Sequence, residues 1–411
     1  MSLTPKVLVM VLAGGEGKRL MPLTLDRAKP AVPFGGTYRL VDFVLSNFAN
    51  ANYLKMVVLT QYKSHSLDRH IAQTWQFSNQ LGNYVAPVPA QMRRGPRWFV
   101  GSADAIYQNF NLIYDERPDI VCVFGADHIY RMDPRQMVHA HRDMGGGLTV
   151  AAIPVPKHEA DQFGIMEVKG DRIVQFHEKP TDPPLMPGRE DMVLASMGNY
   201  VFDTEVLLDA IASDADDETS AHDLGGNIIP NLTKTGQANW YDFNTNNIPG
   251  QTERGRGYWR DVGTIDAYYH ANMDLISPDP LFDLYNMQWP VFTSLSPMPP
   301  AKLVQGSSWA PGTASASLLC HGAIVSGGHV ERTIASSGVF VDDGAVVHDS
   351  ILMQGVTVGP RAIVRRAIID KNVTIPPGVT VGVDHAADLA RGFTISDEGV
   401  VIVQKGAKIK P

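Results

Sequence analysis

A glycine-rich segment near the N-terminus could bind phosphate groups. Residues 12–20 read Leu-Ala-Gly-Gly-Glu-Gly-Lys-Arg-Leu and directly follow an apolar run. Glycines in such a loop let the backbone approach a ligand and offer its N–H groups to phosphate oxygens, and Lys18 and Arg19 add positive charge. The spacing matches neither the dinucleotide-binding fingerprint nor the phosphate loop that ends in Lys-Ser or Lys-Thr. Taken alone, the segment is explained equally well as a tight turn between a strand and a helix.

Two aspartates could hold a divalent cation. Asp127 follows the apolar run 120–124, and Asp261 lies in Tyr-Trp-Arg-Asp-Val-Gly-Thr at 258–264. A carboxylate just beyond the carboxyl end of a buried strand lies where ligands bind in open α/β sheets. Carboxylates far apart in sequence can converge on one Mg²⁺. The structural alternatives are that Asp127 ties its strand to the next loop and that Asp261 caps a helix starting near Thr264.

The elements that must position these residues are alternating strands and helices. Apolar runs at 7–12, 56–59, 120–124 and 148–153 predict strands, and the segments 65–74 and 103–114, which lack Gly and Pro, predict helices. This alternation through about residue 275 is typical of an α/β fold with a parallel or mixed, Rossmann-like sheet.

The last quarter of the chain has a different period. Six prolines at positions 278, 280, 290, 297, 299 and 300 predict a linker over 277–302. Beyond it, apolar residues recur at every sixth position, which is typical of hexapeptide repeats in a left-handed parallel β-helix. We therefore expect a catalytic domain at 1–276 and a β-helix domain at 303–411 that serves oligomer contacts and regulation. The two six-residue registers are Ile334, Phe340, Val346, Leu352, Val358 and Val364, and Val339, Ala345, Ile351, Thr357, Ile363, Ile369, Ile375 and Val381.

Composition limits the possible partners and compartment. The 411 residues include 35 Lys and Arg against 43 Asp and Glu, a net charge of −8, which argues against general affinity for nucleic acid or an anionic membrane. The N-terminus reads as a first core strand rather than a signal peptide, and no apolar stretch approaches the ~20 residues of a membrane span. Two cysteines, Cys122 and Cys320, are too few for a disulfide framework, which favours the reduced cytoplasm.

Several motifs together resemble one enzyme family. The stretch from Leu12 through Arg27-Ala-Lys-Pro-Ala-Val-Pro-Phe-Gly-Gly36 resembles the signature of the sugar-nucleotide pyrophosphorylases, and the resemblance extends from about Val9 to Val403. The runs at 29–32, 127–130 and 258–264 resemble the bacterial members that make ADP-glucose more than those that make UDP- or dTDP-glucose. The resemblance implies Mg²⁺-dependent reaction of ATP with glucose 1-phosphate, giving ADP-glucose and diphosphate for glycogen synthesis.

The resemblance also assigns roles to individual residues. It implies that Arg19, Lys29 and Asp127 act in catalysis and that Asp127 and Asp261 hold the metal. The residues implied to bind the nucleotide are Leu12, Ala13, Gly14, Gly15, Phe99, Gly101 and Asp104, and those implied to bind glucose 1-phosphate are Gly164, Glu178, Lys179, Ser196, Asp223 and Trp259.

The sequence departs from the family pattern at three places. Phe99 stands where Tyr is usual, Leu224 stands where Phe is common, and Gly125-Ala126 reverses the order Ala-Gly before Asp127. The first change keeps an aromatic ring and loses a hydroxyl, and the second makes one apolar contact smaller.

The resemblance further implies a homotetramer regulated by phosphorylated small molecules. Arg27 and Arg39 match residues of the family's anion site, and Arg391 is a candidate contributor from the C-terminal domain. Asp26 stands where the enterobacterial enzymes have an activating Lys, and its carboxylate would repel phosphate, so the identity of the activator does not carry over.

Three other functions remain as alternatives. The chain could use another base or sugar, which a nucleotide panel would detect. Hexapeptide coils often belong to acyltransferases, although His321, His329 and His348 lie in no recognisable acceptor site. A catalytically inactive regulatory subunit is the third alternative, and retention of Arg19, Lys29, Asp127, Lys179 and Asp261 argues against it.

Overall fold

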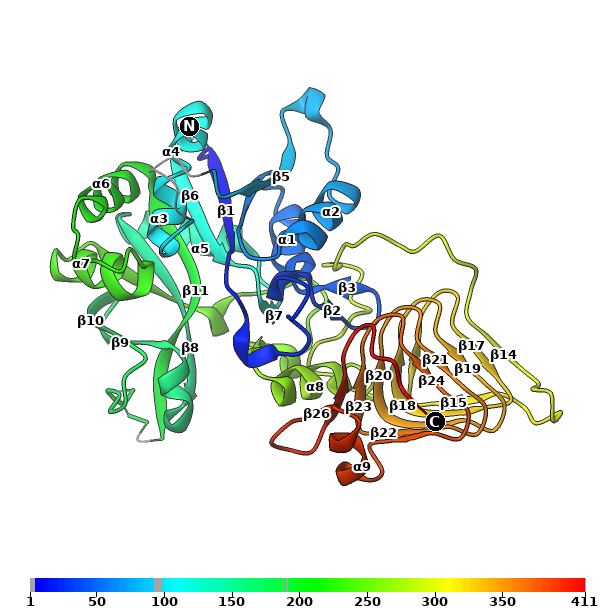
Figure 1. Cartoon of the computed structure of the whole chain (residues 1–411). Helices are drawn as coiled ribbons and strands as arrows, with labels where there is room; N and C mark the ends of the chain where they lie inside the picture. Colours follow the sequence, from blue (N-terminus) through cyan, green and yellow to red (C-terminus); the bar gives the residue numbers. More distant parts are fainter. Residues whose placement is uncertain (1–3, 92–97, 187, 190, 411) are drawn as a thin grey trace.

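The computed structural model describes residues 4–91, 98–186, 188–189 and 191–410. Figure 1 shows an α/β region built from the blue to green part of the chain, with a stack of flat coils in yellow to red beside it. Within the described residues, no helix combines the length and apolar character needed to cross a membrane.

A mixed nine-stranded sheet forms the centre of the α/β region. Its strand order is β5-β4-β1-β6-β11-β8-β12-β10-β9, and β5, β4, β1 and β6 run parallel. Alternate residues of β1 enter two different core clusters, so both faces of this central strand are covered and its sequence is apolar throughout. The strands are β1 (Val7–Ala13), β4 (Lys55–Thr60), β5 (Tyr84–Pro89), β6 (Ile120–Gly125), β8 (Leu148–Pro156), β9 (Gly164–Lys169), β10 (Arg172–Glu178), β11 (Met192–Asp203) and β12 (Ala238–Asp242).

The four strands predicted from apolar runs are confirmed, and so is the helix at 65–74. The second predicted helix, 103–114, is wrong in one respect, because it is broken at Gln108 and Asn109 into α3 and α4. The Asn109 side chain donates to the Ala105 carbonyl at 2.8 Å and competes with continued helical bonding. The helices of this region are α1 (Leu40–Asn50), α2 (His65–Thr74), α3 (Ser102–Tyr107), α4 (Phe110–Glu116), α5 (Pro134–Asp143), α6 (Thr204–Ala215), α7 (Ile229–Lys234) and α8 (Ile265–Asp274).

The proline-rich segment contains no helix or strand before β14 but is held against the α/β region. Phe282 and Trp289 are buried, and the Trp289 carbonyl accepts a hydrogen bond from Arg131 at 3.0 Å. Further along, the Thr293 hydroxyl donates to Asp42 at 2.8 Å. The segment is therefore a docked connection, visible in Figure 1 as the long yellow-green trace that leads to β14.

The C-terminal part is a parallel β-helix. Its strands pair in parallel from coil to coil, with β26 as an antiparallel addition. The strands are β14 (Lys302–Val304), β15 (Thr313–Ser315), β16 (Leu318–Leu319), β17 (Ile324–Ser326), β18 (His329–Ala335), β19 (Phe340–Val341), β20 (Val346–Leu352), β21 (Thr357–Val358), β22 (Ile363–Arg365), β23 (Ala367–Ile369), β24 (Thr374–Ile375), β25 (Thr380–Val381), β26 (Thr394–Ile395) and β27 (Val401–Val403), with helix α9 (His385–Ala390) near the end.

The strict six-residue registers predicted for this domain are wrong in detail. Residues paired on successive coils, such as Ile324 with Phe340 and His329 with Val346, are 16 or 17 positions apart, whereas three hexads would require 18. A fixed period of six therefore drifts off the inward face. Phe340 and Val346 are partly exposed, whereas Val341 next to Phe340 is fully buried in the β-helix core.

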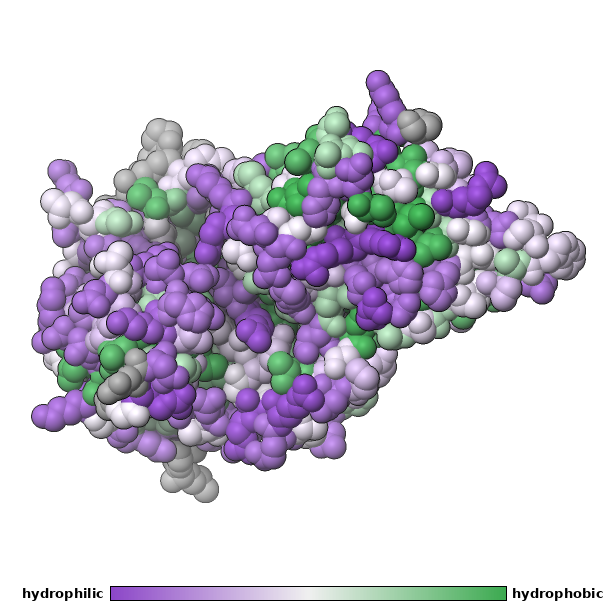
Figure 2. Space-filling model, turned by 90° about the horizontal axis from the view of Figure 1, so that it is seen from below, coloured by the Kyte–Doolittle hydropathy of each residue, from purple (hydrophilic) through white to green (hydrophobic). Residues whose placement is uncertain are grey.

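The two domains share a hydrophobic junction. Ile334, Ile351 and Ile368 leave the β-helix interior and join a cluster that includes Tyr268 and Tyr269 of α8. Figure 2 shows the molecule from below, with hydrophilic residues over most of the α/β region and hydrophobic patches toward the β-helix side.

Candidate active site

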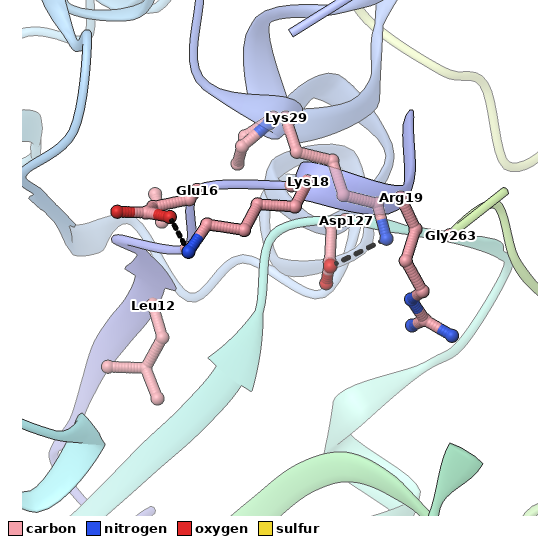
Figure 3. A pocket seen from close by; sticks show the side chains of 11 residues that line it. Leu12, Glu16, Lys18, Arg19, Lys29, Asp127 and Gly263 are labelled. Atoms are coloured by element: carbon pink, nitrogen blue, oxygen red, sulfur yellow. Dashed lines mark ion pairs between the residues drawn. The ribbon is translucent and has the colours of Figure 1, made fainter. Parts of the chain in front are cut away.

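The glycine-rich loop lies at the carboxyl end of β1, over a cavity of about 390 Å³. Gly17 has a φ of 65°, and a Cβ there would lie 3.0 Å from Lys29 Cβ, so both its backbone angle and its packing require glycine. Gly15 faces open space within 4 Å of its missing Cβ. Figure 3 shows the loop side chains Glu16, Lys18 and Arg19 around this cavity, with Lys29 and Asp127 at one wall. The loop thus leaves room for a ligand against its backbone.

A lysine and two aspartates meet beside this loop. Lys29 Nζ lies 2.9 Å from Asp127 Oδ2 and 2.9 Å from Asp261 Oδ1, and Arg19 lies 3.7 Å from the other Asp261 oxygen. The aspartates converge because β7 (His128–Tyr130) and β13 (Trp259–Asp261) pair antiparallel, with Asp261 opposite His128. The predicted trio Arg19, Lys29 and Asp127 and the predicted metal pair Asp127 and Asp261 are therefore brought together in one place.

Burial and charge oppose each other in this group. Burial alone would raise the pKa of Asp127, but the positive charges of Lys29 and His128 and a hydrogen bond from Lys29 outweigh it, so this pKa lies well below its usual range. Burial alone would likewise lower the pKa of Lys29, but Asp127 and Asp261 outweigh it and the pKa is raised. The charged forms of Lys29 and Asp127 therefore stabilise each other.

The donor set suits a divalent cation. Ligand atoms of Asp127, His128 and Asp261 lie within 4.8 Å of one another. Carboxylate oxygens are the ligands that hard divalent cations prefer, so the two aspartates can hold one such ion. The structural alternative for Asp261 is wrong: α8 is capped by Thr264, whose hydroxyl accepts from the Ala267 N–H at 3.2 Å.

His128 was not predicted as a site residue. Its Nε2 lies 3.7 Å from Asp127 Oδ1 and 4.0 Å from Asp261 Oδ1, and its ring packs on Trp259 at 4.9 Å between centroids. In the described part of the chain, the buried His128 Nδ1 and Trp259 Nε1 have no hydrogen-bond partner. Two unpartnered polar atoms beside the carboxylates are available to a ligand. The position next to Asp127 was the one sequence signal that could have indicated His128.

The predicted nucleotide residues divide into two groups. Leu12, Ala13 and Gly15 line the cavity, and Gly14 lies between them in the loop. Phe99, Gly101 and Asp104 instead form a neighbouring wall anchored to β4 by Gln61, whose side chain bonds the Phe99 backbone at 2.7 and 3.3 Å.

That wall is shaped by close backbone contacts. A Cβ at Gly101 would lie 2.2 Å from the His222 carbonyl oxygen, so only glycine fits there. The buried Asp104 carboxylate accepts from the Val100 N–H at 3.0 Å and from Gln108 at 2.8 Å. Asp104 therefore orders the loop rather than presenting its charge to a ligand. Phe99 itself is 9% exposed and packs in the hydrophobic core.

The predicted sugar residues gather around Glu178 at the end of β10. A Cβ at Gly164 would lie 3.1 Å from the Glu178 carboxylate, and one at Gly225 would lie 2.6 Å from it. Lys179 has a φ of 46° and its Nζ lies 3.3 Å from Glu178, with both side chains partly exposed. The backbones of Gly164 and Gly225 therefore pack directly against this carboxylate.

Asp223 and Ser196 are tied to the backbone nearby. Asp223 accepts from the Ser102 hydroxyl at 2.8 Å and from the Gly226 N–H at 2.9 Å, as the cap of a short helical turn that begins with Leu224. The Ser196 hydroxyl accepts from the Gly198 N–H at 3.2 Å. Both residues help to shape the wall, and the Asp223 carboxylate keeps acceptor capacity beyond these two hydrogen bonds.

The two arginines of the predicted effector pair have different surroundings. Arg27 is buried and forms two hydrogen bonds with the buried Asp370 of the β-helix domain, at 2.7 and 2.9 Å. Its charge is paired with Asp370 and buried in this structure, and the assignment of Arg27 to an effector site stays a prediction. Arg391 bonds the Thr380 carbonyl and lies by Asp388, away from the Arg39 cleft.

Arg39 lines a second cavity of about 290 Å³ between the two domains. Arg69 and Lys371 line the same cleft. Burial and the charges of Arg39 and Arg27 lower the pKa of Lys371 to about 7, and burial lowers the pKa of Arg39 to about 10. Concentrated positive charge therefore lies in this cleft in a protein with net negative charge.

The comparisons with known proteins agree with the fold and the site. A phosphate-type loop beside a carboxylate pair at the end of a mixed sheet is the site of a nucleotidyltransferase, and the family model for nucleotidyl transferases matches residues 8–277. A model described as GlmU-like, C-terminal hexapeptide, matches residues 299–403, consistent with a left-handed β-helix.

Full-length relatives narrow the class further. The chain is 58% identical to the glucose-1-phosphate adenylyltransferase of Frankia casuarinae and 57% identical to that of Parafrankia sp., in each case over 99% of both chains. The enzyme of the same name from Mycolicibacterium smegmatis is 57% identical over 98% of this chain and 99% of its own. The chain belongs to the glucose-1-phosphate adenylyltransferase family.

Proposed function

We propose that this protein joins ATP to α-D-glucose 1-phosphate, giving ADP-glucose and diphosphate for the synthesis of glycogen. The observation that carries the proposal is the convergence of Arg19, Lys29, Asp127 and Asp261 beneath a glycine loop that leaves ligand space open. Diphosphate release requires positive charge next to a phosphate-binding backbone; Arg19 and Lys29 supply part of it, and a divalent cation held by Asp127 and Asp261 would supply the rest.

The reaction proceeds by in-line attack of the glucose 1-phosphate oxygen on the α-phosphorus of ATP. Backbone N–H groups of residues 13–15 hold the triphosphate, and Arg19 and Lys29 neutralise the leaving diphosphate. Asp127 and Asp261 would hold Mg²⁺, which supplies further charge neutralisation at the phosphates. No covalent enzyme intermediate is needed, because positioning and charge stabilisation suffice for phosphoryl chemistry of this kind.

The sugar phosphate occupies the neighbouring wall. Glu178 accepts from sugar hydroxyls, and Lys179 beside it pairs with the sugar phosphate as a point charge on a flexible stem. Trp259 contributes an apolar face and an unpartnered indole N–H. Ser196 and Asp223 act mainly by holding the backbone of this wall.

We further propose that phosphorylated effectors bind the interdomain cleft of Arg39, Arg69 and Lys371. This proposal is supported by the three cationic side chains that line the cleft, to which both domains contribute residues. We also propose a homotetramer, which exposed apolar side chains such as Leu303 and Trp309 support. The two free cysteines support a location in the reduced cytoplasm.

A nucleotide panel tests the proposed reaction. Purified protein with Mg²⁺ and glucose 1-phosphate is mixed with ATP, UTP, dTTP, GTP or CTP, and diphosphate release is followed. ATP should support the highest kcat/KM. A higher value with another nucleotide would contradict the proposed substrate and leave the reaction class standing, whereas no release with any of them would contradict both.

A further inference from the structure

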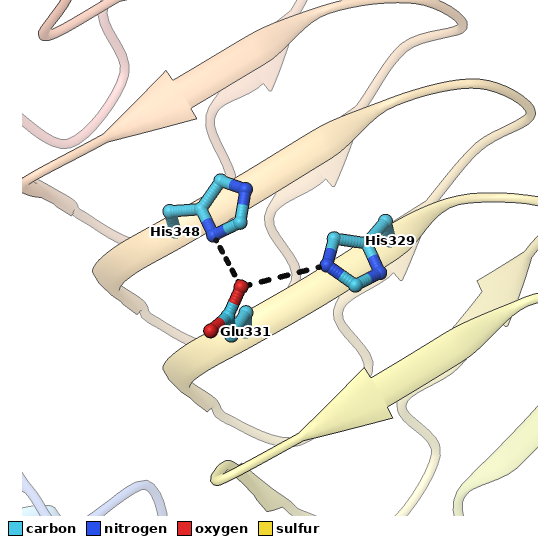
Figure 4. A group of neighbouring side chains, drawn as sticks. All are labelled: His329, Glu331 and His348. Atoms are coloured by element: carbon cyan, nitrogen blue, oxygen red, sulfur yellow. Dashed lines mark ion pairs between the residues drawn. The ribbon is translucent and has the colours of Figure 1, made fainter.

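Three side chains converge on the outer surface of the β-helix, in a group separate from the active-site residues (Figure 4). His329 and Glu331 lie on β18, two residues apart and therefore on one face of that strand. His348 lies directly opposite Glu331 on β20 of the next coil. The regular stacking of coils thus brings two imidazoles and one carboxylate side by side.

Their separations match those of metal ligands. His348 Nδ1 lies 3.2 Å and His329 Nε2 lies 3.7 Å from the same Glu331 oxygen, Oε2. The three ligand atoms lie within 4.8 Å of one another. Ligands about 2.0–2.2 Å from a tetrahedral zinc ion are themselves roughly 3.2–3.6 Å apart. Two of the three pairs therefore need little or no movement to bind one ion.

Neighbouring side chains orient this group. His329 Nδ1 lies 2.7 Å from the Thr313 hydroxyl, and this contact orients the ring with Nε2 toward Glu331. The second Glu331 oxygen accepts from Arg332 at 2.6 Å, and Arg332 is fixed by hydrogen bonds of 2.6 and 2.8 Å to Asp349. Outer partners that fix the orientation of the ligands are a regular feature of metal sites.

We propose that His329, Glu331 and His348 bind one Zn²⁺ or a similar late first-row divalent cation, which joins two neighbouring coils of the β-helix. Imidazole nitrogens with one carboxylate are the donor set such ions prefer, and water would complete the coordination. The side chains are 21–44% exposed, so the ion has direct access from solvent. The role is structural, because the bound ion would link β18 to β20.

The local charge sets a limit on affinity. Arg332 offsets the charge of Glu331. Arg365, which pairs with His348 on the next coil, adds a second positive charge near the site. The alternative is an ion-pair cluster in which protonated histidines contact Glu331 without any metal. The metal site requires the histidines for Zn²⁺ binding, whereas the ion-pair cluster does not bind the ion at all. A direct titration with Zn²⁺ distinguishes the two.

The test uses untagged full-length protein stripped of metal with a chelator and titrated calorimetrically with Zn²⁺ alone. His348→Ala and Glu331→Gln should each lose one Zn²⁺ per chain or bind it at least tenfold more weakly. The control is His158→Ala. His158 is exposed and lies 3.7 Å from Glu159, and among the described residues it belongs to neither group that could hold a metal ion. This variant should bind Zn²⁺ as the wild type does. Zinc held by the active-site carboxylates is identified separately with Asp261→Asn.

A second readout distinguishes a structural ion from adventitious surface binding. Saturating Zn²⁺ should raise the melting temperature of the wild type and of His158→Ala, because ligand binding to the folded state stabilises it, and should not raise that of His348→Ala. The Mg²⁺-supported catalytic rate of His348→Ala should equal that of the wild type. Identical Zn²⁺ stoichiometry and affinity in the wild type, His348→Ala and Glu331→Gln would overturn the proposal.

Discussion

The buried ion pair between the domains allows a quantitative stability prediction. Arg27 and Asp370 are 5% and 1% exposed, and Asp370→Asn keeps the size of the side chain while leaving the Arg27 charge buried without its counter-ion. Breaking one partner of a buried pair typically costs about 3–5 kcal/mol. At about 2–4 °C per kcal/mol for domains of this size, the melting temperature should fall by roughly 6–20 °C.

The assay is differential scanning calorimetry of Asp370→Asn against a matched control. Asp279→Asn breaks an Arg-Asp contact of the same 2.7 Å length, to Arg254, in which both side chains are more than half exposed. Such a surface pair is worth about 0–1 kcal/mol, so the control should lose a few degrees at most. Arg27→Met with Asp370→Leu removes both charges and should regain most of the lost stability. Equal losses in Asp370→Asn and Asp279→Asn would refute the reasoning.

Three further predictions concern the active site and the cleft. Asp127→Asn should lower kcat about a thousandfold, roughly 4 kcal/mol, with little change in melting temperature; a variant keeping more than about a tenth of wild-type kcat across a Mg²⁺ titration would contradict the metal role. Lys179→Ala should raise the KM for glucose 1-phosphate and leave that for ATP nearly unchanged, and an unaltered sugar-phosphate KM in initial-rate kinetics would place Lys179 outside the pocket. Because the pKa of Lys371 is about 7, this side chain gains charge as the pH falls, so sulfate should bind the cleft more tightly at pH 6 than at pH 8; calorimetric titration of Lys371→Gln should show a weaker trend, and an identical trend would exclude Lys371.

The sequence predicted the part of the site that depends on strand ends. β1 and β6 are adjacent and parallel, so the segments after them, with the glycine loop and Asp127, had to meet at one edge of the sheet. The pairing of Asp261 with His128 could not be predicted in the same way, because it depends on two three-residue strands joined across 130 positions of sequence. His128 was missed for that reason.

The different burial of the two predicted effector arginines could not be seen in the sequence motif. Arg27 and Arg39 are both arginines near the phosphate loop, yet one is paired with Asp370, 343 positions away, and only the other lines a cleft. The β-helix period was recognisable for a simpler reason, since every coil repeats the same inward positions. The register of the coils could not be predicted in this way. Paired residues on successive coils are 16 or 17 positions apart, so each such coil has one repeat shorter than six residues, and the apolar pattern does not show which repeat is short.

The most direct test of the proposed activity follows the α-phosphorus of ATP. ATP labelled at the α-phosphorus is incubated with glucose 1-phosphate, Mg²⁺ and the enzyme, and the products are separated and identified by mass spectrometry. In-line attack at this atom predicts that all transferred label appears in ADP-glucose and none in diphosphate. Label found in diphosphate, or unlabelled ADP-glucose, or no ADP-glucose at all under conditions where another nucleotide yields its sugar nucleotide, would contradict the proposal.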